Sequence, residues 1–228
     1  IAEAMLDAVT PLNGKPVTIR LVDIGGDKEL PYIDFGEVER DPFLGRRGVR
    51  LLLAYPNLLR DQLKALLRLS RDIDLRVMIP MVTFADEIAS VRGLMEEVAG
   101  EIGVDRLPPL GAMVETPSAA LCIGELAAQA DFLSVGTNDL TQYTLAVGRE
   151  NAMVSSYFRD DHPAVFRLLE MIVAEAGDCP LSICGELAGR IEAVERLVQL
   201  GYRTLSVAPP LVAAVKLAVR QATARPQE

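Results

Sequence analysis

The segment LGAMVETPS at residues 110–118 is followed, after one helical stretch, by the segment FLSVGTNDL at residues 132–140. Each begins with a short apolar run, over 110–115 and 132–136, which is typical of a strand buried on both faces. Apolar residues at three and four spacing predict a helix over 118–128 between them, and Pro117 suits its entrance. Strand, helix and strand in this order predict an α/β fold with a parallel sheet.

The same pattern extends along the whole chain. Pro42, Pro56 and Pro163 stand at three further helix entrances. The expected strands cover 17–23, 76–82, 110–115, 132–136, 181–184 and 204–207, and the expected helices cover 58–69, 84–98, 118–128, 164–174 and 191–200.

Six strand-helix units favour a (β/α)8 TIM-barrel type, although a closed barrel takes eight strands. An open parallel sheet would expose unpaired edges, so we expect the first two strands to precede Ile1, or another chain to cover the gap. The start at Ile1 rather than Met indicates a piece of a longer polypeptide. The sequence thus predicts one partial barrel domain over 1–228, with a polar tail over 221–228.

Composition excludes several classes of function. Lys and Arg number 23 against 32 Asp and Glu, a net charge of -9, which argues against nucleic acid or an anionic membrane as partner. No apolar run is long enough for a membrane span, and no signal peptide is evident. Three cysteines without metal-ligand spacing fit a reducing cytoplasm, so we expect a cytoplasmic protein.

Two segments early in the chain combine cations with glycine. The first strand leads into a glycine turn that carries Arg20, Asp23, Gly25 and Lys28. An ordinary turn with a surface ion pair is as good an interpretation of this segment as a ligand site. Residues 41–50 bring three arginines to a helix start, where cations oppose the helix dipole unless an anion lies between them. We expect Arg46 and Arg50 to point to water, and Arg47 with Arg20 to clamp an anion.

Carboxylates follow the third and fourth predicted strands. Glu115 and Asp139 at the ends of consecutive parallel strands predict two oxygen ligands for Mg²⁺, although each would also serve as a helix cap. Asn138 can donate to an anionic ligand beside that metal. Arg149 can swing back to the same place, although a solvated arginine is the default.

Cys184 ends the fifth predicted strand. A buried cysteine is more often a small hydrophobe, but at this rim a thiol can give or take a proton at carbon. Cys122 and Cys179 lack such a setting and are expected to serve packing and a loop. His162, the single histidine, precedes Pro163 and is expected to cap a helix.

Five ordered stretches, residues 19–32, 41–50, 111–117, 134–147 and 184–189, closely resemble the C-terminal domain of enzyme I, the phosphoenolpyruvate-protein phosphotransferase of the bacterial phosphotransferase system. The resemblance implies that the domain binds phosphoenolpyruvate and Mg²⁺ at the mouth of a (β/α)8 barrel. It implies Glu115 and Asp139 as metal ligands and Cys184 as the acid that protonates the enolate carbon as pyruvate forms. The residues that hold the phosphate and carboxylate would be Arg20, Lys28, Arg47, Asn138 and Arg149, with Arg47 catalytic beside Cys184.

In that family the phosphoryl group passes to a histidine on a separate N-terminal domain and then to a histidine phosphocarrier protein. The barrel also forms the homodimer. The resemblance leaves open whether the pathway is sugar uptake or nitrogen-linked regulation. Without the upstream strands, this piece alone is expected to be impaired or inactive.

Some residues depart from the family pattern, namely Gly148, Glu150, Arg190 and the strand at 206–208. Three alternatives therefore stay open. They are a barrel of the pyruvate phosphate dikinase or phosphoenolpyruvate synthase type, a Mg²⁺-dependent lyase acting on a pyruvate-like enolate, and a degenerate binding or dimerisation module.

Overall fold

The computed structural model describes residue 12 and residues 14–25 and 39–224. The chain divides into two compact units, residues 1–112 and 113–228, with the division inside strand β3 (Leu110–Val114). Lys28 and the last four residues of the expected tail lie outside the described residues. The expectation of one barrel domain over 1–228 stays a prediction.

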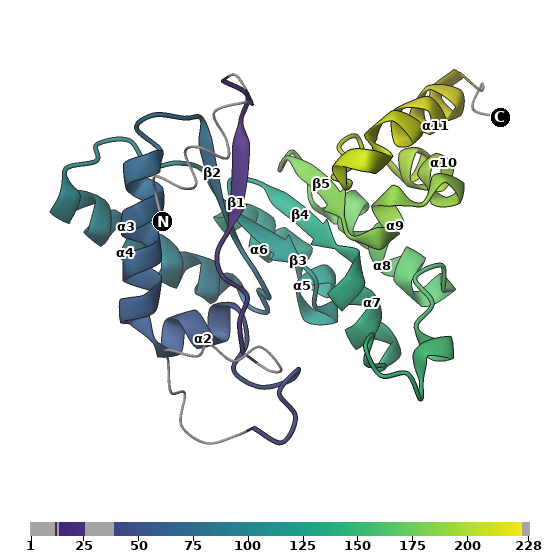
Figure 1. The fold of residues 1–228 in the computed structure, drawn as a ribbon, viewed down its shortest axis with the longest axis horizontal. Coiled ribbons are helices and arrows are strands. Elements are labelled where there is room, and N and C mark those ends of the chain that lie inside the picture. Colours follow the sequence, from purple (N-terminus) through teal and green to yellow (C-terminus); the bar gives the residue numbers. More distant parts are fainter. Residues whose placement is uncertain (1–11, 13, 26–38, 225–228) are drawn as a thin grey trace. The chain divides into compact units, whose positions relative to one another are not determined.

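The first unit is built on parallel strand pairs (Figure 1). Strand β1 (Val17–Arg20) pairs with β2 (Leu75–Ile79) so that Val17 is opposite Leu75. Strand β2 pairs in turn with the start of β3, with Val77 opposite Leu110. The helices of this unit are α2 (Val49–Ala54), α3 (Pro56–Leu69) and α4 (Ala85–Ile102).

Leucines at helical spacing make the core of this unit. Leu59, Leu63, Leu66 and Leu67 of α3 are fully buried, and α3 packs against α4 and β2. Strand β1 differs from the sequence expectation, because its residues alternate between half-buried and exposed. The expected burial on both faces is therefore wrong for β1, which among the described residues pairs with β2 only.

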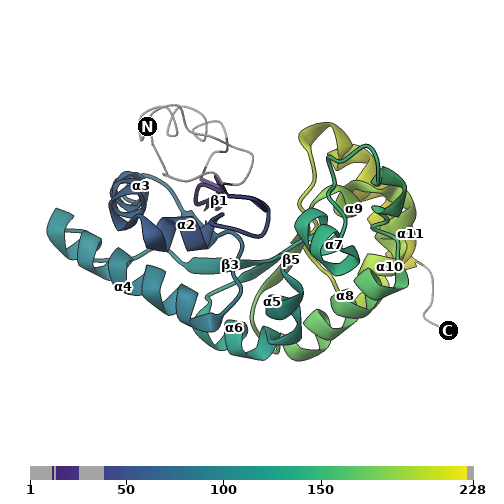
Figure 2. The same ribbon diagram turned by 90° about the horizontal axis from the view of Figure 1, so that it is seen from below.

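The second unit contains β4 (Leu133–Gly136) and β5 (Leu181–Cys184), which pair in parallel with Gly136 opposite Cys184. Every residue of β4 is buried, as expected for a central parallel strand. Figure 2 shows α8 (Pro163–Glu175) running beside α5 (Pro117–Leu121), a contact that buries apolar side chains of both helices. The remaining helices are α6 (Ile123–Gln129), α7 (Thr137–Leu145), α9 (Glu186–Gly189), α10 (Ile191–Leu200) and α11 (Val212–Ala224), with short 3-10 turns at Ser155–Tyr157 and Pro209–Leu211.

Most predicted elements are confirmed. Five of the six expected strands form, whereas the segment 204–207 contributes only an isolated bridge between Leu205 and Ile183. The expected helix over 118–128 is interrupted at Cys122 and becomes α5 and α6. Helix α11 was not expected, and it continues to Ala224, into the predicted polar tail.

Prolines mark three of the four expected helix entrances. Pro56, Pro117 and Pro163 each occupy the first position of a helix, where the missing N–H has no intrahelical partner to lose. Pro42 lies in a turn instead. Among the described residues, no helix combines the length and apolar character needed to cross a membrane.

Candidate functional site

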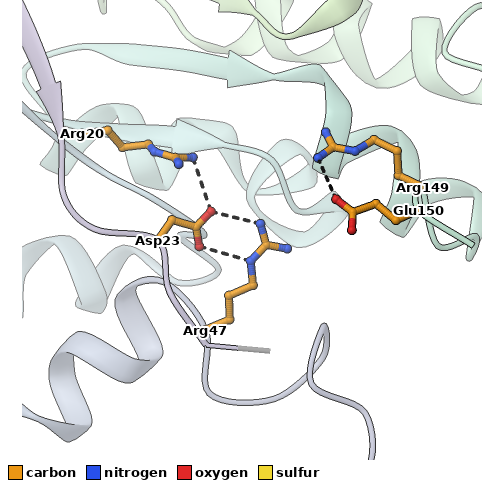
Figure 3. A network of polar contacts seen from close by, with 5 residues as sticks. All are labelled: Arg20, Asp23, Arg47, Arg149 and Glu150. Atoms are coloured by element: carbon orange, nitrogen blue, oxygen red, sulfur yellow. Dashed lines mark hydrogen bonds and ion pairs between the residues drawn. The ribbon is translucent and has the colours of Figure 1, made fainter. Parts of the chain in front are cut away.

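In the first unit, the buried carboxylate of Asp23 contacts the side chains of Arg20 and Arg47. Arg47 donates from Nε to Asp23 Oδ1 at 3.1 Å and from Nη2 to Asp23 Oδ2 at 3.0 Å, a two-pronged contact (Figure 3). Arg20 Nη1 lies 3.4 Å from the same Oδ2. The Asp23 and Arg47 side chains are only 2% and 10% exposed. We call Arg20, Asp23 and Arg47 the Asp23 cluster; with two guanidinium groups and one carboxylate it carries a net positive charge.

Close approach of two loops places Arg47 against Asp23. The Gly48 N–H donates to Ile24 O at 3.2 Å, which joins the two loops through their backbones. Gly25 has a φ of 106° and no room for a side chain, because a Cβ there would collide with the carbonyl group of Arg46. The glycine after β1 is therefore required by the contact that brings Arg47 to Asp23.

The other two arginines of residues 41–50, Arg46 and Arg50, differ in exposure and in their contacts. Arg46 is exposed, as expected, and its backbone N–H donates to the Glu39 carboxylate at 2.9 and 3.0 Å. Arg50 does not point to water, so that expectation is wrong. Its guanidinium donates to Leu44 O and to Thr83 Oγ1, each at 3.1 Å, and so ties two loops of the first unit together.

The second unit holds the two predicted metal ligands. Glu115 directly follows β3, is 2% exposed, and lies against the end of β4, since a Cβ on Gly136 would stand 2.7 Å from Glu115 Oε2. Asp139 lies in the first turn of α7 rather than at the end of β4 itself, and is half-buried. A carboxylate at that helix start is favoured by the helix dipole. Among the described residues, no group of three or more His, Cys, Asp or Glu side chains forms a metal cluster.

The start of α7 also holds the loop after β5. Thr137 Oγ1 donates to Cys184 O at 2.9 Å, and the Glu186 N–H donates to Asn138 Oδ1 at 2.9 Å. Gly185 between them has a φ of 90°, and a Cβ there would collide with Thr137 Oγ1. We call residues 184–186 the thiol turn. Because the oxygen of Asn138 accepts the bond from Glu186, the NH₂ group is the end that can donate to an anion.

The Cys184 thiol is held by β4. Its Sγ donates to Val135 O at 3.3 Å, and Ser134 Oγ donates to Sγ at 3.7 Å. Cys184 is half-buried, whereas Ser134 is 5% exposed. The thiol thus has one acceptor and one donor on the neighbouring strand, an arrangement suited to a group that must exchange a proton.

Arg149 follows α7 and is exposed. Its Nη2 lies 3.8 Å from Glu150 Oε1, and the two side chains are 38% and 64% exposed (Figure 3). An exposed pair at this distance contributes little stability. Its backbone N–H donates to Gln142 Oε1 at 2.9 Å, which fixes the chain at this point but not the guanidinium.

A second buried aspartate lies before α8. Arg190 Nη1 donates to Asp160 Oδ1 at 2.6 Å, with the two side chains 54% and 8% exposed. Burial raises the pKa of the Asp160 carboxyl above its ordinary value of 3.8, while Arg190 opposes the rise and Asp161 and Glu186 add to it. Arg190, a departure from the family pattern, therefore has a structural partner.

Of the remaining candidate residues, His162 and Cys179 lie where the sequence indicated, whereas Cys122 does not. His162 precedes α8 and its Nδ1 accepts the Ala164 N–H at 3.1 Å, so its capping role is confirmed. Cys122 lies at the junction of α5 and α6, where it is exposed rather than packed. Cys179 lies in the loop before β5, and burial, with Asp131 adding, raises the pKa of its thiol.

Sequence reasoning missed four residues that hold these groups in place. Asp23 was noted only as an acid near a base, and Ser134, Thr137 and Asp160 were not singled out. One signal was available for Ser134: a polar residue inside a run otherwise expected to be apolar needs a partner when it is buried. No comparable signal pairs Asp160 with Arg190, which are 30 residues apart.

Comparisons with known proteins identify the family of the chain. The profile of the family described as "PEP-utilising enzyme, PEP-binding domain" matches residues 1–224. The multiphosphoryl transfer protein of Rhodobacter capsulatus is 43% identical over 222 residues, which cover 96% of this chain and 26% of that protein. The phosphoenolpyruvate-protein phosphotransferase of Haloferax volcanii is 41% identical over 229 residues, covering 96% of this chain and 40% of that protein.

A protein of Escherichia coli K12 named phosphoenolpyruvate-dependent phosphotransferase system is 43% identical over 217 residues, covering 92% of this chain and 29% of that protein. The chain thus spans 26% to 40% of the length of these relatives. A crystal structure of a citrate lyase from Burkholderia xenovorans LB400 matches with a TM-score of 0.54 at 21% identity, over 70% of this chain and 53% of that chain, a likeness of fold alone. The α/β class is confirmed, and this chain belongs to the family of PEP-utilising enzymes, of which it carries the PEP-binding domain.

Proposed function

We propose that this chain binds phosphoenolpyruvate together with Mg²⁺ and takes part in a phosphoenolpyruvate-protein phosphotransferase reaction. In that reaction the phosphoryl group passes to a histidine on a separate domain and pyruvate is released. The observation that carries the proposal is the match of residues 1–224 to the PEP-binding domain. The names of relatives at 41% to 43% identity support the reaction class.

The Asp23 cluster supports the binding of an anion. A guanidinium fork matches the geometry of phosphate and carboxylate oxygens, and Asp23 fixes the plane of the Arg47 fork before any ligand arrives. Two guanidinium groups against one carboxylate leave positive charge for a ligand. We propose that Arg20 and Arg47, with Lys28, Asn138 and Arg149, hold the phosphate and carboxylate of phosphoenolpyruvate.

The donor set of the second unit fits Mg²⁺. Glu115 and Asp139 offer hard carboxylate oxygens, and Mg²⁺ characteristically takes one or two protein carboxylates and fills its other positions with water and substrate phosphate. The pair would therefore suffice without a third acidic ligand. When bound, the ion would neutralise charge on the phosphate during transfer.

The thiol turn supports protonation at carbon. Loss of the phosphoryl group leaves the enolate of pyruvate, and the Cys184 S–H would give its proton to the methylene carbon to complete pyruvate. Thr137 and Asn138, both at the start of α7, bond to the two ends of the turn and so keep the thiol in one place. Positioning and charge neutralisation are the main requirements of phosphoryl transfer.

The histidine that accepts the phosphoryl group is proposed to lie outside this chain. His162 is the single histidine of the sequence, and its Nδ1 accepts the Ala164 N–H that begins α8. Phosphorylation of Nδ1 would remove this cap. The proposed partners are therefore a phosphohistidine domain and a histidine phosphocarrier protein, with a homodimer of the barrel domain as in the family.

Calorimetric titration of phosphoenolpyruvate with and without Mg²⁺, in a protein extended toward the length of its relatives, tests the proposal. We expect binding that depends on Mg²⁺, and Asp139→Asn should remove most of that dependence. Asp161→Asn is a matched control, because Asp161 is an exposed acid that pairs with Arg159. Unchanged Mg²⁺ dependence in Asp139→Asn would contradict the ligand assignment.

Two further variants test the anion and acid roles. Arg149→Gln should weaken binding by about tenfold, as for loss of one charge-assisted contact, whereas Arg159→Gln should not. Cys184→Ala should retain binding but lose most pyruvate formation, which a coupled assay for pyruvate measures. Full turnover in that variant would rule out the acid role.

One observation favours a second candidate, a binding or dimerisation module that has lost catalysis. Glu150 is one of the departures from the family pattern, and its carboxylate lies 3.8 Å from the Arg149 guanidinium that should meet the anion. The same calorimetry separates the two candidates. No heat with phosphoenolpyruvate in either condition supports the module, and Mg²⁺-dependent heat supports the enzyme.

A further inference from the structure

We propose that Ser134 is a positioning residue for the Cys184 thiol, and that its hydroxyl stabilises the thiolate left after Cys184 gives up its proton. The inference rests on the proposed function, in which Cys184 protonates the enolate carbon. Ser134 lies on β4, 50 residues before Cys184, and belongs to none of the groups proposed to bind phosphoenolpyruvate or Mg²⁺.

Strand register places the two side chains on the same face. Gly136 is opposite Cys184 and Ser134 is opposite Ser182, so Ser134 and Cys184 lie two residues apart along neighbouring strands. Side chains separated by two residues point to the same side of a sheet. Ser134 Oγ accordingly reaches Cys184 Sγ at 3.7 Å across the pair of strands.

The contacts of the thiol with Val135 and Ser134 have opposite effects on its charge. The Val135 carbonyl, 3.3 Å from Sγ, accepts the S–H and so favours the protonated form, which a proton donor needs before the reaction. The Ser134 hydroxyl donates toward sulfur and so favours the thiolate, which the donor becomes afterwards. Because Ser134 is 5% exposed, little water competes with this bond.

The step balances without a further reagent. The S–H bond of Cys184 breaks as a C–H bond forms at the methylene carbon, and the electron pair of the S–H bond remains on sulfur. The Ser134 O–H bonds to that sulfur without transferring its own proton. A proton from water then restores the thiol.

The pH dependence of thiol alkylation in the full chain tests this role, with each cysteine followed separately by peptide mass spectrometry. In Ser134→Ala the midpoint of Cys184 alkylation should rise by about one pH unit, since a charge-assisted hydrogen bond to the thiolate is lost. Ser134→Thr keeps the hydroxyl and should restore the midpoint. An unchanged midpoint in Ser134→Ala, or the same rise in Ser134→Thr, would overturn the proposal.

Ser182→Ala is the matched control. Ser182 is opposite Ser134 in the register, but its hydroxyl donates to Leu133 O at 3.3 Å rather than to the thiol. It should leave the Cys184 midpoint in place, and an equal rise there would show that the effect is not specific to Ser134. The alkylation rate of half-buried Cys179 reports whether the fold is intact. If Cys179 reacts faster in Ser134→Ala, Ser134→Cys provides the second test. Its side chain is a weaker donor than serine, so the Cys184 midpoint should rise by less than in Ser134→Ala.

The pH profile of pyruvate formation connects the bond to turnover. In Ser134→Ala, the part of this pH profile that reports the ionisation of Cys184 should shift by the same amount as the alkylation midpoint. The alkylation measurement needs no phosphoenolpyruvate, so it tests the role of Ser134 separately from the proposed function. Absence of turnover in the parent protein contradicts the proposed function, whereas an alkylation midpoint unmoved by Ser134→Ala contradicts the role of Ser134.

Discussion

The Asp23 cluster and the thiol turn hold their functional groups by different forces. In the first unit, Arg20 and Arg47 meet one carboxylate that is almost completely buried. In the second, Thr137 and Asn138 hold residues 184–186 through neutral hydrogen bonds to the backbone, at 2.9 Å each. Charge fixes Arg20 and Arg47 of the proposed anion site, and uncharged bonds fix the proposed proton donor.

The difference follows from the two tasks. A guanidinium cannot be buried without an anion beside it, so a buried arginine needs a permanent partner such as Asp23. A thiol that gives up a proton must pass between neutral and anionic forms, and a nearby fixed charge would favour one form strongly. The comparison therefore predicts that removal of the Asp23 charge lowers the free energy of unfolding strongly. Loss of one neutral hydrogen bond at the thiol turn should lower it less.

The largest effect is expected at Asp23. Asp23→Ala leaves the Arg47 guanidinium buried without its carboxylate and should lower the free energy of unfolding by about 3 to 5 kcal/mol. Urea denaturation measures the change. Asp161→Ala in the exposed pair with Arg159 is the control and should cost less than about 1 kcal/mol. Equal losses in the two variants would contradict the special role of the buried pair.

Gly185 should give the next largest effect. Gly185→Ala forces a side chain into a φ of 90° and against Thr137 Oγ1, so we expect a loss of about 2 to 3 kcal/mol of unfolding free energy. Gly177→Ala is the control, since Gly177 has a φ of 58° and open space around its missing Cβ. It should lose about 1 kcal/mol, the cost of the backbone conformation alone. A larger loss at Gly177 would show that the contact with Thr137 is unimportant.

Thr137 tests the neutral bond itself. Thr137→Val removes the hydroxyl that donates to Cys184 O with little change of shape, and should cost about 1 to 2 kcal/mol in thermal or urea denaturation. Thr141→Val on the same helix is the control, because within the described part of the chain the buried Thr141 Oγ1 has no hydrogen-bond partner. That variant should be neutral or stabilised. A Thr137→Val protein as stable as Thr141→Val would mean that the bond contributes nothing.

Asp160 should give the smallest effect, and the effect depends on pH. Its pKa is raised in the folded protein, mainly by burial, so the folded state binds this proton more tightly than the unfolded state. Relative to Asp160→Asn, the parent protein should therefore lose stability as the pH rises from just below 3.8 through the raised pKa, and change no further above it. Unfolding free energies of both proteins across the acidic range measure this. A parent protein that gains stability over that range would contradict the sign.

The contrast between Asp23 and Asp160 explains the order of these effects. Asp23 meets two guanidinium groups, one of them by a two-pronged contact. Asp160 meets the single half-exposed Arg190, and Asp161 and Glu186 act on it with like charge. The two buried aspartates therefore differ in their neighbours rather than in their burial.

Much of the fold was predictable because it depends on local patterns. The run at 181–184 forms β5 with the expected bounds, and Pro163 begins α8 as expected. The errors occur where neighbours decide the outcome. The segment 204–207 has a strand-like composition but forms only the bridge at Leu205. The residues of β1 alternate between half-buried and exposed, although their composition favours burial.

For the candidate site, residue types were predictable and their partners were not. Arg47 was recognised from its position at a helix start, Asn138 from its position after a strand, and Cys184 from its position at the end of one. That Arg50 bonds to Thr83 rather than to water required the fold, since the two residues are 33 apart in the chain.

The amino-acid sequence alone determined the class of fold, the family and the chemical character of the residues after each strand, because apolar runs, prolines and ordered motifs are local features. The tertiary structure decided which groups hold one another, as with Arg47 and Asp23 across 24 residues, or Asn138 and Glu186 across 48. The reason is physical. A hydrogen bond requires two atoms about 3 Å apart, and for residues distant in the chain that distance is set by strand register and loop contact, which no single segment encodes.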